Sequence, residues 1–70
     1  MQFFEVKVLN GQGVALKSLI VMARVNSWDA VRAVIAKHYP EWATNRFSAG
    51  LVSEAEANRL AGYFKLEIIG

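Results

Sequence analysis

A turn-forming segment at residues 10–13, Asn-Gly-Gln-Gly, constrains this 70-residue chain more than any other feature. Asn-Gly supplies the positive φ angles that a tight β-hairpin turn requires. Residues 3–9 before it alternate in the manner of a strand, and residues 14–25 after it are rich in β-branched and aliphatic side chains. The sequence therefore predicts an N-terminal hairpin of two strands, the second of them long.

A helix is predicted to follow the hairpin. Asn26 or Ser27 caps its N-terminus, and Asp29 lies in the first turn, where a carboxylate interacts favourably with the helix dipole. Pro40 ends the helix at about Tyr39, because proline disfavours helical geometry in the residue before it. Apolar residues and one histidine recur at helical spacing and form a single face: Ala30, Val31, Val34, Ile35 and His38.

The remaining residues predict two further strands with a short element between them. Residues 45–52 alternate weakly as a strand, in which Gly50 marks a bulge or bend. Ser53 and Glu56 match a capping box, which predicts a short helix over residues 55–61 ended by Gly62, with an ordinary loop as the alternative. Residues 63–69 alternate again and predict the last strand.

This order of elements is typical of an α+β fold. We expect one domain over residues 1–70, with a single, mostly antiparallel sheet of about four strands and one main helix packed on one face. The helix contributes Val31, Val34 and Ile35 to the core. The sheet positions predicted to face the helix are Phe4, Val6, Val8, Leu19, Val21, Ala23, Val25, Phe47, Ala49, Leu51, Phe64, Leu66 and Ile68.

The opposite face of the predicted sheet mixes apolar and charged residues. Apolar residues make up 54% of the chain, more than a domain of this size readily hides. We expect one helix, or two, to leave much of this face open. Leu16, Ile20 and Met22 of the second strand are then predicted to meet a second copy of the chain, giving a homo-oligomer, most simply a dimer. An exposed sheet with scattered apolar residues is the plainer alternative.

Nucleic-acid binding by the same face is the alternative function. Aromatic rings on an open sheet stack on bases, while lysine and arginine contact phosphates. Glu5 and Glu67 share this face, and the net charge is only +2, so the pattern favours self-association over this alternative. The residues predicted to form the nucleic-acid face are Phe3, Lys7, Arg24, Arg46, Tyr63 and Lys65.

Two large aromatic residues, Tyr39 and Trp42, flank Pro40 at the end of the predicted helix. A rigid aromatic corner of this kind is either a hot spot for a protein partner or a packing corner that closes the core. Trp28, in the first turn of the helix, is expected to cover the edge of the core.

Few residues of the chain could support catalysis or bind a metal ion. His38 is the only histidine, and the chain has no cysteine. The sequence offers no second histidine and no clustered carboxylates that could make His38 an acid–base group or a metal ligand. We therefore expect His38 to lie half-buried in the last helical turn, where the helix dipole favours its positive charge. Gly11 and Gly13 join two strands and do not form a phosphate-binding loop. We predict no catalytic, cofactor-binding or metal-binding residues, and expect a non-enzymatic protein.

The chain also lacks the pattern of a membrane protein. Its longest unbroken apolar run covers residues 19–23, far short of the roughly 20 residues that span a bilayer. Glu5 interrupts the apolar N-terminus, and no basic region precedes it, so a signal peptide is not expected. We therefore expect a cytoplasmic protein without membrane contact.

Overall fold

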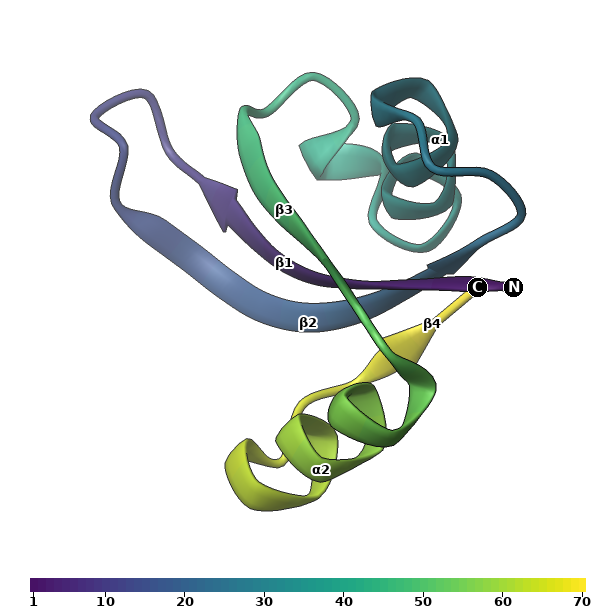
Figure 1. The fold of residues 1–70 in the computed structure, drawn as a ribbon. Helices are drawn as coiled ribbons and strands as arrows, with labels where there is room; N and C mark the ends of the chain where they lie inside the picture. Colours follow the sequence, from purple (N-terminus) through teal and green to yellow (C-terminus); the bar gives the residue numbers. More distant parts are fainter.

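In the computed structural model of residues Met1–Gly70, the predicted hairpin forms the centre of a four-stranded sheet (Figure 1). Strand β1 (Gln2–Leu9) pairs antiparallel with strand β2 (Ala15–Ala23), with a register shift at Val8/Leu9. The turn depends on Asn10, whose side-chain oxygen accepts hydrogen bonds from the N–H groups of Gln12 and Val14 at 2.8 and 3.0 Å. The positive φ angle falls on Gly13, at 80°, and not on the Asn-Gly pair.

The strand order is β3-β1-β2-β4, and the sheet is mostly antiparallel as predicted, with one parallel pairing between β2 and β4 that makes it mixed. Strand β3 (Phe47–Val52) pairs antiparallel with β1, and the two-residue strand β4 (Ile68–Ile69) pairs parallel with β2. Both β2 and β3 run opposite to β1, so they share a direction. The helix after β3 returns the chain, so that β4 again runs in this direction and meets β2 in parallel.

Helix α1 (Trp28–His38) covers one face of the sheet, as predicted. Ser27 is its N-cap, because its hydroxyl oxygen accepts a hydrogen bond from the Ala30 N–H at 3.1 Å. The helix ends before a 3₁₀ turn, η1 (Pro40–Trp42). The core beneath α1 takes apolar side chains from the helix and from strands β1, β2 and β4: Phe4, Val6, Val8, Leu19, Val21, Ala23, Val31, Ile35 and Ile69.

The second face, predicted to stay largely open, is partly covered by helix α2 (Glu54–Phe64), as Figure 1 shows below the sheet. The hydroxyl oxygen of Ser53 accepts a hydrogen bond from the Glu56 N–H at 3.1 Å, so the predicted cap is confirmed. Ile20, Ala57 and Leu60 form a small second core here. Neither helix is long and apolar enough to cross a membrane.

The C-terminal strand predicted over residues 63–69 is wrong for most of its length. Helix α2 runs through Gly62 to Phe64, and Lys65 ends it in the left-handed conformation, with φ 56° and ψ 47°. Glycine does not stop a helix when other residues hold the turn around it, since its cost there is only about 1 kcal/mol. The strand that remains is Ile68–Ile69 alone.

Candidate interaction edge

The residues predicted for self-association do not form one open patch. Ile20 is fully buried under α2, so the expectation that it is available to a second copy is wrong. Met22 is half-buried, and Leu16 is 49% exposed near the irregularity of β2. Strand β2 also pairs with β1 along its length and with β4 at Ile20 and Val21. Alternation identified the face correctly, but helix α2 takes the place that the second copy would need.

Strand β3 is the longer of the sheet's two edge strands, since the other, β4, has only two residues. It pairs with β1 only, and its six residues contain no charged side chain and no proline (Figure 1). The pairing with β1 continues through Gly50 without a shift, so the predicted bulge is absent. Natural edge strands are usually protected by charges, prolines or bulges, because an unprotected edge readily pairs with another strand. None of these devices is present in β3.

The backbone of β3 presents regularly spaced polar groups on this edge. The Leu9 N–H donates to the Arg46 carbonyl at 2.8 Å, which makes these two residues a hydrogen-bonded pair. In an antiparallel ladder such pairs alternate, so Ser48, Gly50 and Val52 face β1. The N–H and C=O groups of Phe47, Ala49 and Leu51 therefore point away from the sheet. No backbone hydrogen bond outside the strand ladder uses them.

Side chains on the α1 side of β3 give the edge an apolar border. Phe47 and Ala49 are half-buried and Leu51 is 54% exposed, so apolar surface increases along the strand. Trp28, which is 60% exposed, packs edge-on against Phe47 with ring centroids 4.5 Å apart. Trp28 lies at the edge of the core, as predicted, although most of its ring is exposed.

Arg32 contacts Phe47 and the segment that leads into β3. Its guanidinium lies 4.9 Å from the Phe47 ring centroid and donates to the carbonyl oxygens of Ala43 and Asn45 at 2.7 and 3.0 Å. The Asn45 amide in turn donates to the Leu9 carbonyl at 2.9 Å. These bonds hold the segment that leads into β3, so the edge is a preformed feature of the fold.

Small residues on the other side of β3 leave the approach to the edge unobstructed. Ser48 and Gly50 alternate with Ala49 along the strand, and a methyl group in place of the Gly50 hydrogen would meet no atom within 4 Å. A second strand can therefore come to hydrogen-bonding distance without displacing side chains at the centre of β3.

The six residues predicted for a nucleic-acid face lie in four separate places. Phe3 packs in the core under α2, and Arg24 lies beyond the end of β2. Tyr63 and Lys65 lie at the C-terminal end of α2, while Lys7 and Arg46 are exposed near the β1–β3 ladder. A groove of about 330 Å³ between α2 and the sheet brings Lys7 close to one exposed aromatic side chain, and is lined by Glu5, Lys7, Ser18, Phe64 and Leu66.

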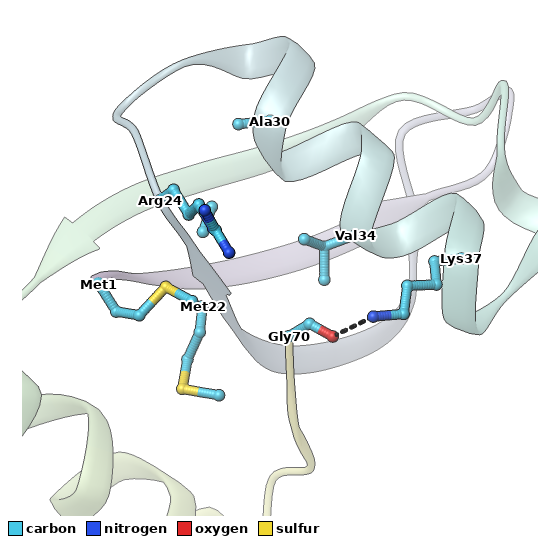
Figure 2. A pocket seen from close by; sticks show the side chains of 8 residues that line it. Met1, Met22, Arg24, Ala30, Val34, Lys37 and Gly70 are labelled. Atoms are coloured by element: carbon cyan, nitrogen blue, oxygen red, sulfur yellow. Dashed lines mark hydrogen bonds between the residues drawn. The ribbon is translucent and has the colours of Figure 1, made fainter.

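Arg24 lines a different pocket, of about 380 Å³, between α1 and the end of β2 (Figure 2). Met1, Met22 and Val34 contribute its apolar surface. Lys37 shares this pocket with Arg24, but its ammonium group donates to the Gly70 carbonyl oxygen at 3.1 Å, the bond drawn in Figure 2.

His38 is exposed, and not half-buried as predicted. It lies in the last helical turn, where its Nε2 is 2.9 Å from the Gly70 carbonyl oxygen. No group of three or more His, Cys, Asp or Glu side chains is arranged to hold a metal ion.

Tyr39 and Trp42 form a stacked pair with ring centroids 4.6 Å apart and 26° between the ring planes. Both are half-buried against the core under α1, which supports the packing-corner interpretation. The Tyr39 hydroxyl donates to the Glu67 carboxylate, and Lys17 lies 5.5 Å from the Tyr39 ring centroid. The hydrogen bond to Glu67 raises the pKa of Tyr39, with smaller contributions from desolvation and the carboxylate charge.

No family model matches the sequence, and comparisons with curated proteins and with solved structures find no match either.

Proposed function

We propose that this chain is a non-enzymatic assembly module that forms a homodimer through the free edge of β3. The observation that carries the proposal is the outward row of N–H and C=O groups at Phe47, Ala49 and Leu51 on a strand without charges, proline or bulges. A second strand satisfies these groups with main-chain hydrogen bonds and continues the sheet.

A second copy of the same chain is the partner that this edge favours. Two antiparallel strands related by a two-fold axis present identical edges to each other, so every outward donor finds an acceptor. The side chains brought together are then apolar ones, from Phe47, Ala49 and Leu51, and no like charges oppose one another. Exposed Leu51 and Trp28 lie at this edge and lose water-accessible surface on pairing.

This proposal moves the dimer contact from the second strand to β3. Ile20 is buried under α2 and, with Val21, pairs with β4, so the middle of β2 is not open to a second copy. The apolar excess of the sequence is partly taken up by that second core. The exposed apolar residues at β3 remain to be covered by a partner.

The test is the molecular mass in solution of the wild-type chain and of Ala49→Pro. The wild type should have a mass of twice 7.8 kDa by light scattering after size exclusion. Proline at position 49 removes an outward N–H but leaves the hydrogen bonds between β1 and β3 intact, because those use Ser48 and Gly50. Ala49→Pro should therefore be a folded monomer.

Ala49→Thr is the matched control, since it keeps the N–H and favours strand geometry. It should remain a dimer, and circular dichroism should be the same for all three proteins. A wild type that stays at 7.8 kDa at millimolar concentration would overturn the proposal.

Nucleic-acid binding is the second candidate, favoured by the groove in which exposed Lys7 and Phe64 lie close together. Phe64 would stack on a base and Lys7 would contact a phosphate. Titration of a labelled single-stranded oligonucleotide should then show salt-sensitive micromolar binding that Phe64→Ala weakens and Ala49→Pro leaves unchanged. Absence of such binding at low salt would remove this candidate.

A further inference from the structure

We infer that two copies pair with Ala49 opposite Ala49, and that Arg46 of each copy forms an ion pair with Glu54 of the other. This inference rests on the proposed dimer through β3 and specifies its register and its charged contacts. It follows from three properties of the chain: the direction of the free backbone groups, the position of α2, and two charges near this edge, Arg46 and Glu54, that have no partner within one copy.

The backbone sets the register. A two-fold axis between antiparallel strands keeps the α1 sides of both copies on the same side of the joined sheet. Outward N–H and C=O groups occur at Phe47, Ala49 and Leu51 only, so these three must lie opposite one another. All three are paired only when Ala49 faces Ala49 and Phe47 faces Leu51 of the second copy. Shifting the strands by two residues leaves at least one outward residue on each copy unpaired.

The same register brings compatible side chains of the two copies together. Phe47 lies opposite Leu51, an aromatic and an aliphatic residue in direct cross-strand contact, and this pair occurs twice because of the symmetry. Trp28 already packs on Phe47 at 4.5 Å, so it lies next to the Leu51 of the second copy. On the α2 side, small Ser48 and Gly50 face each other and cause no clash.

Arg46 extends this register by one residue beyond β3, on the side of the sheet that carries α2. Its position lies opposite Val52 of the second copy, the last residue before the cap of α2. Helix α2 starts where β3 ends (Figure 1). In the paired register its first residue, Glu54, therefore comes next to Arg46 of the other chain.

Both charges are available for this contact. Arg46 and Glu54 are exposed, and the side chain of neither forms a hydrogen bond or ion pair within one copy. The other acidic residue of this helical turn, Glu56, is engaged by Arg59. Opposite charges at the two ends of an uncharged strand favour antiparallel self-pairing in this register over slipped or parallel pairing.

Charge reversal provides the test, read out as the dimer dissociation constant by sedimentation or light scattering. Arg46→Glu alone and Glu54→Arg alone each place like charges together twice in a homodimer, so each should weaken the dimer about tenfold at low salt. An equimolar mixture of the two variants should dimerise as tightly as the wild type, because the heterodimer pairs opposite charges in place of like ones. Added salt should reduce these differences.

Two matched controls carry the same charge changes elsewhere. Arg24→Glu and Glu41→Arg lie away from β3 and should leave the dissociation constant unchanged. If the mixture is no tighter than either variant while Ala49→Pro still abolishes the dimer, the inferred register is overturned and the β3 dimer stands. If the wild type is a monomer, the proposed function fails together with the inference.

Discussion

Tyr39 joins three separate parts of the chain through one side chain. Its ring stacks on Trp42 and lies under the ammonium group of Lys17, while its hydroxyl donates to Glu67 just before β4. Lys17 is also 3.9 Å from the Glu67 carboxylate. The end of α1 is thereby linked to β2 and to the C-terminal segment. Because the Glu67 bond raises the pKa of Tyr39, this link is sensitive to alkaline pH.

The direction of this pH dependence is set by the hydroxyl proton. The Tyr39 hydroxyl can donate only while it is protonated, and its pKa in the folded chain is above the ordinary 10.0. Its stabilising effect is therefore complete below about pH 10 and is lost as the pH rises through the raised pKa. Tyr39→Phe should be less stable than the wild type by a constant amount up to about pH 10, with a smaller difference at higher pH.

Urea unfolding followed by tryptophan fluorescence between about pH 8 and 11 measures this difference. Tyr63→Phe is the control, since Tyr63 is 68% exposed and its side chain makes no hydrogen bond. Its stability should follow the wild type at every pH. A stability difference for Tyr39→Phe that persists unchanged at the alkaline end of this range would contradict a contribution from the protonated hydroxyl.

At the scale of single residues, alternation identified the α1 side of the hairpin correctly. Phe4, Val6, Val8, Leu19 and Val21 are all buried there, because a strand's period of two is a local property. The same alternation assigned Ile20 to the opposite face but could not indicate what covers it. That depends on α2, which lies far along the chain beyond both α1 and β3.

Helix α2 shows how far local signals determine an element. Its start is predictable from the sequence, because Ser53 and Glu56 form the expected cap. Its end is not, since Lys65 adopts the left-handed conformation that glycine usually takes. Alternation at Phe64, Leu66 and Ile68 resembles a strand, yet Phe64 is the last helical residue and only Ile68 belongs to β4.

Replacing Lys65 with glycine should therefore stabilise the chain. The left-handed conformation is strained for a residue with a Cβ, and glycine relieves that strain at some cost in chain entropy. We expect a gain of about 0.5–1 kcal/mol, which raises the unfolding midpoint by roughly 4 °C in a chain of this size. Thermal unfolding followed by circular dichroism measures it.

Lys65→Ala separates strain from charge, because it removes the ammonium group but keeps the Cβ. It should show no gain in the unfolding midpoint. Equal stabilisation by alanine and glycine would indicate that the lysine charge, and not the backbone conformation, limits stability at this position.

At the scale of the whole molecule, the α+β class and the single four-stranded sheet were predictable, whereas the candidate edge was not. Phe47, Ala49 and Leu51 were correctly placed on the α1 side of their strand. Which strand lies at the edge, however, depends on the order β3-β1-β2-β4, and no local pattern encodes it. Only when this order is known does the absence of charges in β3 indicate an unprotected sheet edge.

Dimer formation makes the stability of the whole molecule depend on concentration. Unfolding of a dimer separates two chains, so mass action raises the unfolding midpoint as the protein concentration increases. We expect the wild-type midpoint to rise steadily over about a hundredfold range of concentration, whereas that of Ala49→Pro should be constant. Calorimetry at a series of concentrations measures both.

The fluorescence of Trp28 shows whether this concentration dependence arises at β3. Trp28 is 60% exposed in one copy and lies at the proposed contact, whereas Trp42 is half-buried in the packing corner. Quenching by acrylamide, measured in Trp42→Phe so that Trp28 is the only tryptophan, should decrease as rising concentration drives the edges together. The same measurement with Ala49→Pro added should show constant quenching. A midpoint that rises with concentration while Trp28 stays equally accessible would place the dimer contact away from β3, since pairing at that edge necessarily covers the ring beside Phe47.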